Sequence, residues 1–340
     1  MRWVLCIDPG FSEVRVAALS ETGEGELCSL SPETDVFDWA LRKYGTHPES
    51  VVIAGGRYAP CPAGPYLIDE RMAEDARRFS PWHPRNRMTV RVFEYCTSRG
   101  IPGVAVDPMS SAFLPEKAQL SGHPAWERRG VYYAFPALKA FSAACKSMGL
   151  DTQSARGVVA YLGDEVSVSA HDGLSVVETS DPVDCEGPYG FTSAGTAPAT
   201  AFVSWLHERH AGDSLDETVE LLKFRSGAFA YAGVPSISGF LEKLAKGDGP
   251  AVRAVRGMAY QVAKEIGRAL AALKGKADAI VLTGPGVSAE PLAAEVEDRV
   301  AKWCTVVRVP HDGCMRMLGI EGFSAVVSNR FVRYPGEKRS

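Results

Sequence analysis

The sequence predicts a duplicated α/β fold, and three observations support this prediction. Residues 156–173 contain an apolar run, a short turn at Gly163 and then an apolar–polar alternation, which is typical of two paired strands. The start of the chain repeats this pattern, because an apolar run is followed by Asp8-Pro-Gly10 and a second, mostly apolar run. Strand and helix patterns alternate in both halves. Two copies of one strand–turn–strand unit therefore suggest two related domains with a ligand between them.

Composition narrows the class of protein. At roughly 150 residues per domain, 340 residues favour two domains. A net charge of −4 and a pI near 6.0 argue against a nucleic-acid partner. We expect no membrane partner, because no apolar run approaches the roughly 20 residues that span a bilayer. The eight cysteines lack a Cys-x-x-Cys spacing and several lie in apolar runs, which favours reduced thiols and a cytoplasmic protein.

The first half is predicted to form a domain over residues 1–150. A helix-rich stretch over 124–148 closes it, and Pro136 is expected to break or kink that stretch. The other expected elements are helices near 36–44, 69–78 and 87–98, strands at 51–53 and 104–106, and a proline-rich loop at 60–65.

The second domain is predicted over residues 151–313. Its longest helix spans about 250–274, where apolar residues recur every three or four positions and form one buried stripe. A final helix, 314–330, is expected to pack back on the first domain, and 331–340 is a tail. The remaining expected elements are an irregular loop at 186–198, helices at 199–209, 215–222 and 238–245, a helix from about 290, and strands at 279–282 and 306–309.

Three glycine-containing turns are candidates for a phosphate site. They lie at Gly10, at Gly163 and at Gly284 and Gly286, each after an apolar run. Backbone N–H groups of such turns and the N-terminus of a following helix can bind an anion. Alone, the turn at 283–286 is more often a plain turn. Within a duplicated frame the three turns would face one cleft, which favours a nucleotide.

Short motifs along nearly the whole chain occur in an order and spacing that match a known family. They are Asp107-Pro108, Ser121-Gly-His-Pro124, Glu127-Arg-Arg129, Leu162-Gly163, Glu186-Gly-Pro188, Ala194-Gly-Thr196, Met258-Ala-Tyr-Gln-Val-Ala-Lys-Glu-Ile266 and Leu282-Thr-Gly284. This ordered set resembles butyrate kinase, in the acetate/butyrate kinase group of the actin-like ATPase superfamily. The resemblance implies two actin-like (ribonuclease H-like) domains around a central interdomain cleft, a homodimer, and reversible phosphate transfer between ATP and a short carboxylate with Mg²⁺.

The first turn departs from that family. Members resembling this chain carry a loop like Asn-Pro-Gly-Ser-Thr-Ser-Thr-Lys, whereas this chain has Asp8-Pro-Gly10-Phe-Ser12-Glu13. Gly10 and Ser12 stay candidates for contacts with phosphate. The carboxylate of Asp8 repels phosphate unless Mg²⁺ lies between them. Asp8 is therefore a candidate catalytic and metal-side residue, and the alternative is a turn-forming Asp-Pro-Gly.

Two arginines of the family are also replaced. Ala54 precedes Gly55-Gly56 where the family has an arginine, and Ser193 stands before the Ala-Gly195-Thr196 motif where the family has another. Such guanidiniums stabilise the transferring phosphoryl group, and losing one can cost on the order of 10³-fold in rate. Arg57 is a candidate catalytic replacement, and Gly195 and Thr196 are candidates for nucleotide contacts.

The central turn and the C-terminal metal position differ as well. Where the family reads His-Leu-Gly-Gly-Gly, this chain has Tyr161-Leu-Gly163-Asp164-Glu165. A donor imidazole is lost, and two acids are expected to obstruct ATP phosphates sterically and electrostatically. Cys and Met occupy the place of a family acidic pair that helps to hold Mg²⁺, and Asp312 lies two residues earlier as a candidate replacement.

One family feature persists near the site. His83-Pro-Arg-Asn86 matches a His-x-x-Asn pattern, so His83 is a candidate catalytic or ligand-contacting residue; the alternative is a surface histidine in a proline-rich loop. Arg57, Arg85 and Arg87 form a replacement anion site if they converge, and otherwise a solvated basic patch.

Three hypotheses follow. The losses favour a butyrate kinase-like protein that binds ATP or ADP, an acyl or small carboxylate ligand, or a protein partner, without catalysing the family's reaction. The second hypothesis is an acyl-phosphate-forming kinase in which Arg57, Arg85 and Asp312 replace the missing groups. The third is a different actin-like ATP-dependent activity, in which Asp8 and the acids of the central turn bind Mg²⁺. Fold alone does not choose among them.

Overall fold

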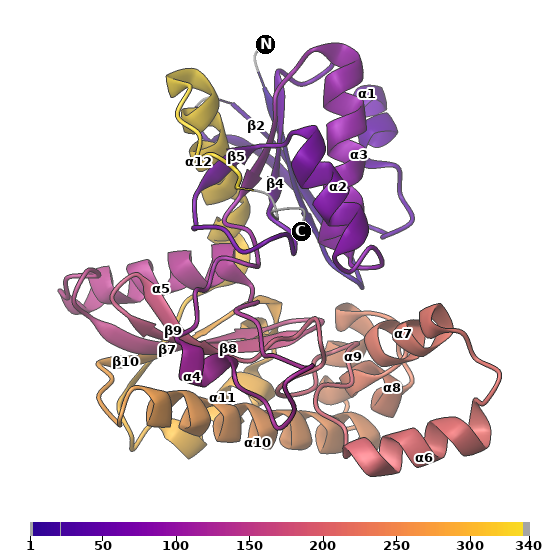
Figure 1. Ribbon diagram of the computed structural model, residues 1–340, viewed down its shortest axis with the longest axis vertical. Coiled ribbons are helices and arrows are strands. Elements are labelled where there is room, and N and C mark those ends of the chain that lie inside the picture. The colour runs from indigo at the N-terminus through magenta and orange to yellow at the C-terminus, as the bar shows by residue number, and fades with distance from the viewer. Residues whose placement is uncertain (1–2, 21, 336–340) are drawn as a thin grey trace. The chain divides into compact units, whose positions relative to one another are not determined.

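The protein folds into two compact units. A computed structural model describes residues 3–20 and 22–335 (Figure 1). The first unit comprises Met1–Phe113, Arg129–Phe135 and Asp312–Ser340, and the second comprises Leu114–Arg128 and Pro136–His311. These units differ from the predicted ranges mainly at 114–128 and 136–150, which were expected in the first domain and group with the second unit.

The first unit contains a six-stranded sheet. Its strands are β1 (Val4–Pro9), β2 (Val14–Leu19), β3 (Gly25–Leu30), β4 (Ser50–Ala54), β5 (Pro65–Leu67) and β6 (Gly103–Val106). They lie in the order β3-β2-β1-β4-β6-β5. The three strands β1 to β3 pair antiparallel, and β4 and β6 continue the sheet parallel to β1.

The second unit repeats this arrangement in a five-stranded sheet. Its strands are β7 (Arg156–Leu162), β8 (Val166–Asp172), β9 (Ser175–Thr179), β10 (Ala279–Thr283) and β11 (Thr305–Arg308), in the order β11-β10-β7-β8-β9. An antiparallel meander, β7 to β9, is again followed by two strands parallel to the first. The shared strand order confirms the duplicated α/β fold that the two strand–turn–strand patterns predicted.

Helices cover both faces of the first sheet. Because successive side chains of a strand point to opposite faces, Leu5 and Ile7 of β1 face one core and Val4 and Cys6 the other. The first core includes α1 (Val36–Tyr44), α2 (Glu70–Arg78) and α3 (Pro84–Arg99), and the second includes α12 (Cys314–Ser328) (Figure 1). Burial on both faces explains why the strands read as continuous apolar runs.

Helix ends in the first unit follow local capping chemistry. Asp35 begins α1, and its side chain accepts hydrogen bonds from the backbone N–H groups of Phe37 and Asp38. Gly45 ends the helix with a φ of 67°, a left-handed conformation that glycine adopts without steric cost. The sequence therefore specifies both ends of this helix, and its predicted range is confirmed.

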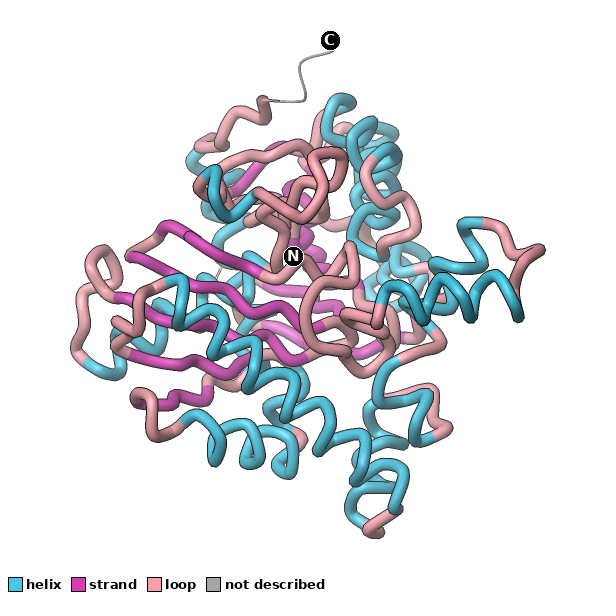
Figure 2. Tube along the Cα trace, turned by 60° about the horizontal axis from the view of Figure 1, so that its bottom comes forward, coloured by secondary structure: helices cyan, strands magenta, loops and turns pink. Residues whose placement is uncertain are grey.

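In the second unit, the long helix α10 (Gly249–Ala272) packs on one face of the sheet (Figures 1 and 2). Its buried stripe includes Met258, Val262 and Ile266, as the three-to-four periodicity predicted. The other elements are α4 (Glu116–Gln119), α5 (Ala134–Met148), α6 (Ala199–Arg209), α7 (Leu215–Phe224), α8 (Gly227–Ala232), α9 (Ile237–Ala245), η1 (Pro285–Ser288), α11 (Glu290–Val300) and η2 (His311–Gly313).

Two expectations on local structure need correction. The stretch 124–148 is helical only over α5, and Pro136 lies in its first turn, where the missing N–H breaks no helical hydrogen bond. Part of the expected tail 331–340 is anchored, because the buried Tyr334 hydroxyl accepts a 3.0 Å hydrogen bond from the Ala59 N–H. Residues 336–340 lie outside the described residues.

The expectations about the cysteines and about membrane-spanning segments can be compared with the structure. The eight cysteine thiols are all free. Within residues 3–20 and 22–335, no helix is both long enough and apolar enough to cross a membrane.

A buried histidine makes the second unit sensitive to acid. His171 on β8 is fully buried, stacks on Phe141 of α5 at 4.9 Å, and shares a 2.8 Å hydrogen bond with Ser169. Burial lowers the pKa of His171 from 6.5 to about 3. Below pH 6.5 the unfolded chain therefore binds a proton that the folded chain does not, and this part of the stability is lost as pH falls toward 3.

We predict that His171→Gln flattens the pH dependence of stability. Urea unfolding at pH 7, 6, 5 and 4 should give a slope that is smaller than that of the original protein by up to about 1.4 kcal/mol per pH unit. His207→Gln, at an exposed histidine, is the control and should leave the slope unchanged. An equal slope for His171→Gln and the original protein would show that His171 does not titrate in this way.

Candidate functional site

The turn between β1 and β2 is anchored to the start of α3. The Gly10 N–H donates a 2.9 Å hydrogen bond to the Glu13 carbonyl and closes the turn. Phe11, where the family has a hydroxyl side chain, is buried and meets the His83 ring edge-on with 5.2 Å between centroids. Gly10 and Ser12 are partly exposed. The substitution to Phe11 thus contributes a packing contact where a hydroxyl would offer a donor.

Asp8, at the end of β1, is held by two arginines. One carboxylate oxygen accepts a 2.6 Å hydrogen bond from Arg15, and the other accepts a 2.8 Å bond from Arg85. Asp8 is 6% exposed, so these charge-assisted bonds lie in a poorly hydrated place. A cation approaching Asp8 would compete with both guanidiniums and be repelled by them. The role of Asp8 as a metal-side residue stays a prediction, and this geometry does not favour it.

The three arginines of the predicted anion site have different environments. Arg85 is 1% exposed, and its guanidinium lies over the Tyr133 ring at 4.6 Å in addition to its bond to Asp8. Arg57 is also buried and donates to the Ser80 hydroxyl at 3.2 Å. Arg87 is exposed. The alternative of a solvated basic patch is therefore wrong for Arg57 and Arg85.

His83 and Asn86 organise the start of α3. His83 is the N-cap residue, and its Nδ1 accepts a 3.2 Å hydrogen bond from the Arg85 N–H, which leaves the ring proton on Nε2. Asn86 accepts from the Arg57 N–H and donates to the Arg57 carbonyl, both at 2.8 Å. Both side chains are fully buried, so the alternative of a surface histidine is wrong. Contact of His83 with a ligand stays a prediction.

The central turn between β7 and β8 is covered by residues 190–193. The Phe191 N–H donates to the Gly163 carbonyl at 3.0 Å, and the Ser193 N–H donates to the Asp164 carbonyl at 3.1 Å. Tyr161 is buried and lies edge-on to the His311 ring at 5.8 Å. A Cβ added at Gly163 would lie 2.7 Å from the Tyr161 ring. Gly163 therefore accommodates the tyrosine that replaces the family's histidine.

Glu165 does not face solvent as an isolated acid. It is fully buried, and its carboxylate accepts a 2.9 Å hydrogen bond from the ammonium of Lys223 on α7. Lys223 also donates to the Pro182 carbonyl. Burial works to lower the pKa of Lys223, but Glu165 and Cys185 together outweigh it through their charges and hydrogen bonds, so the pKa lies above its ordinary value. The charge of Glu165 is thus compensated by a cation, and this geometry does not favour the expected repulsion of phosphate by Glu165. The obstruction expected from Asp164 stays a prediction.

Gly195 and Thr196 close the loop that follows the Glu186-Gly-Pro motif. Gly195 has a φ of +61°, and a Cβ there would lie 2.4 Å from the Tyr189 nitrogen. The Thr196 hydroxyl accepts a 2.8 Å hydrogen bond from the Gly187 N–H, and the Thr196 N–H donates to the Gly187 carbonyl at 2.8 Å. Both residues thus stabilise the loop, and their contact with a nucleotide stays a prediction.

Gly284 and Gly286 are required by close packing on β7. A Cβ at Gly284 would lie 2.5 Å from the Leu162 carbonyl oxygen, and one at Gly286 would lie 2.8 Å from the Leu162 Cβ. The φ of Gly284 is +94°, which other residues rarely adopt. Packing therefore explains these glycines without a nucleotide, whose contact with them stays a prediction.

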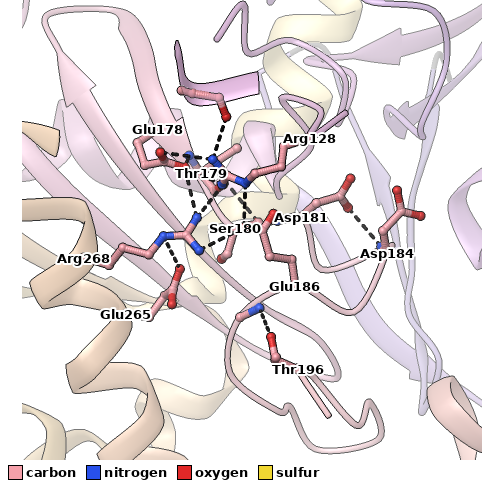
Figure 3. A network of polar contacts seen from close by, with 12 residues as sticks. Arg128, Glu178, Thr179, Ser180, Asp181, Asp184, Glu186, Thr196, Glu265 and Arg268 are labelled. Atoms are coloured by element: carbon pink, nitrogen blue, oxygen red, sulfur yellow. Dashed lines mark hydrogen bonds and ion pairs between the residues drawn. The ribbon is translucent and has the colours of Figure 1, made fainter. Parts of the chain in front are cut away.

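A five-residue ion network lies near this loop, and the motif analysis did not foresee it (Figure 3). Arg128 donates to Glu178 at 2.6 Å and to Glu186 at 2.8 Å. Arg268 donates to the same two acids at 3.0 and 2.9 Å, and its third nitrogen lies 3.2 Å from Glu265. Burial raises the pKa of Glu265 above its ordinary value, and Arg268 offsets only part of this effect. Three members of the network, Arg128, Glu186 and Glu265, lie in motifs that carry the family resemblance, but the motifs do not indicate which side chains pair.

No metal-binding cluster is assembled by the described side chains, since no group of three or more His, Cys, Asp or Glu residues is placed to hold an ion. The side chain of Asp312 lies outside the described residues, so its predicted metal role stays a prediction.

Comparison with solved structures identifies the fold of this chain. Two solved structures share the fold. A propionate kinase from Francisella tularensis matches with a TM-score of 0.75 and 18% identity, over 94% of this chain and 99% of that chain. An acetate kinase from Porphyromonas gingivalis matches with a TM-score of 0.70 and 18% identity, over 96% of this chain and 100% of that chain. The two units are therefore actin-like domains related by duplication.

Sequence relatives narrow the class further. A probable butyrate kinase from Enterococcus faecalis is 29% identical over 96% of both chains. One from Listeria monocytogenes is 31% identical over 89% of this chain and 91% of the relative. The model of the acetokinase family matches residues 135–335. The chain belongs to the acetokinase family.

We predict that Asp8→Ala strongly destabilises the protein. The substitution leaves Arg85, a buried cation, without its carboxylate, and breaking such a pair costs about 3–5 kcal/mol. Urea unfolding at neutral pH measures this loss.

Glu220→Ala is the matched control, because it removes the acid of an exposed pair with Arg225 and should cost no more than about 1 kcal/mol. A loss for Asp8→Ala no larger than that of the control would contradict a structural role for the Asp8 ion pairs.

Proposed function

We propose that this chain is a divergent, butyrate kinase-like member of the acetokinase family that does not catalyse the transfer of phosphate to a carboxylate. One observation carries the proposal: both oxygens of the Asp8 carboxylate are engaged by guanidiniums. Arg85, a candidate for a replacement phosphate clamp, is thereby committed to an acid. Phosphoryl transfer depends mainly on such clamps, so the lost family arginines are left without an evident substitute at this position.

Nucleotide binding is part of the proposal. The glycine turns at Gly163, Gly195 and Gly284, with Gly286 and Thr196, accompany the family's fold, and we propose that the second unit takes the adenosine part of ATP or ADP. The residues around Asp8 do not fit Mg²⁺ well, because two cations already neutralise the carboxylate. We therefore assign no step to the metal.

The alternative is an ATP-dependent carboxylate kinase with a rearranged site. Arg57 favours it, because it follows Gly55-Gly56 closely, where the family has an arginine just before the glycines, and its buried guanidinium donates to the Ser80 hydroxyl. In this alternative Arg57 would stabilise the transferring phosphoryl group, and His83 would contact the carboxylate. A small carboxylate or acyl compound is the ligand in either case. We further propose that the protein is a cytoplasmic homodimer. A protein partner is compatible with the non-catalytic proposal.

A hydroxamate assay separates the two proposals. Hydroxylamine traps an acyl phosphate, so the protein is incubated with ATP, Mg²⁺ and straight-chain acids from acetate to hexanoate, beside an active acetate kinase as a positive control. We expect no hydroxamate from this protein with any acid. Production that is lost on the order of 10³-fold in Arg57→Ala would contradict the proposal and support the rearranged kinase.

A further inference from the structure

We propose that the second unit has a separate binding site for a small multivalent anion, in a pocket at the end of α10. The pocket has a volume of about 690 Å³, within the usual range for small-ligand sites. It is lined by Pro115, Lys117, Ala118, Arg156, Asp172, Val177, Glu178, Ala271, Ala272, Leu273, Lys274 and Lys276. These residues come from α4, from the edge of the sheet formed by β7, β8 and β9, and from the end of α10 and the turn after it.

The walls of this pocket are tied together by the ion network around Arg128. Arg128 donates from its side chain to the Ala118 carbonyl at 2.6 Å and from its backbone N–H to the Gln119 carbonyl at 2.8 Å, which fixes α4. The same guanidinium binds Glu178 of β9, which also bonds Arg268 of α10 (Figure 3). Three elements that are distant in sequence are therefore held in place before any ligand arrives, which lowers the entropic cost of binding.

The acids that line the pocket are already paired with arginines. Asp172 accepts a 2.8 Å hydrogen bond from Arg156. Glu178 accepts bonds from two guanidiniums, Arg128 and Arg268, at 2.6 and 3.0 Å. Each carboxylate that lines the pocket is therefore paired with at least one guanidinium, and Glu178 shares its two guanidiniums with Glu186 and Glu265.

The lysines of the pocket have no such partners. Among the described residues, no acid forms an ion pair with Lys117, Lys274 or Lys276, and none of the three ammoniums has a hydrogen bond to another side chain. Three exposed positive charges thus surround a concave space whose own acids are paired. Such an arrangement attracts a compact ligand with several negative charges, and an ammonium binds phosphate or carboxylate oxygens as a point charge.

Lys274 occupies a position that local structure alone would give to glycine. It follows Leu273, the C-cap residue of α10, and has a φ of 57°. A left-handed residue after a helix is usually glycine, which avoids the steric cost that a Cβ brings in this conformation. The N–H groups of Lys274 and Gly275 bond the carbonyls of Ala271 and Leu270 at 3.0 and 2.9 Å, so they satisfy two of the helix's terminal acceptors. A lysine in this left-handed conformation strains the backbone, which is consistent with a role for its positive charge in binding an anion.

The test is calorimetric titration of the full chain with inorganic tripolyphosphate at about 50 mM salt without Mg²⁺. We expect saturable binding that weakens as salt is raised, since exposed charges are screened. The double variant Lys117→Ala/Lys276→Ala should raise the dissociation constant for tripolyphosphate about tenfold. This change corresponds to about 0.7 kcal/mol for each of the two lost charges. Lys274→Gly, which removes a charge and suits the backbone, should also weaken binding.

Lys146→Ala/Lys302→Ala is the matched control, because it removes two exposed lysines outside the pocket and should leave the dissociation constant unchanged. Titration in the presence of saturating ADP should give the same result, because the pocket is distinct from the proposed nucleotide turns. The proposal is overturned if the original protein does not bind tripolyphosphate at millimolar concentration. It is also overturned if the pocket variants bind as tightly as the control, or if ADP abolishes binding.

Discussion

The pairing of Asp8 with Arg15 and Arg85 is the interaction on which the first unit's site depends. It joins the end of β1, the start of β2 and the first turn of α3 through one buried carboxylate. A buried charge is tolerated only when it is paired, so each of the three residues requires the others. Phe11, His83 and Asn86 pack and bond around the same point. The turn that a phosphate would approach in the family is here organised by charges within the protein.

The second unit uses the same principle at the equivalent turn. Glu165 follows β7 as Asp8 ends β1, and it is buried against Lys223. An acid placed opposite phosphate would be repulsive as an isolated charge, but as half of a buried ion pair its charge is compensated and contributes little to the external field. Both turns therefore differ from the family by internal charge compensation, which explains how acids persist where the family has neutral residues.

Local patterns in the sequence predicted much of the fold. Caps specified α1, an apolar stripe specified α10, and the repeated hairpin pattern predicted the duplication. The third strand of each meander was not predicted; β3 is largely exposed and so lacks an apolar alternation. Pro136 was read as a helix breaker because its position in the first turn depends on where α5 begins.

The site was harder to predict, because its contacts join residues that are far apart in the chain. Asp8 and Arg85 are separated by 77 residues, and Glu165 and Lys223 by 58. A resemblance identified which family residues are missing, but it could not show which side chains neutralise their replacements. Asp8 and Glu165 were therefore expected to repel phosphate, whereas packing of distant elements gave both of them cationic partners.

Calorimetric titration with ATP and with ADP, each with and without Mg²⁺, tests the central claim most directly. If Asp8 and Glu165 are committed to ion pairs within the protein, nucleotide binding should depend little on Mg²⁺ and should not distinguish ATP from ADP. Micromolar binding of ATP that requires Mg²⁺ and exceeds that of ADP would contradict this account, because it would mean that the acidic turns form a working site for metal and phosphate.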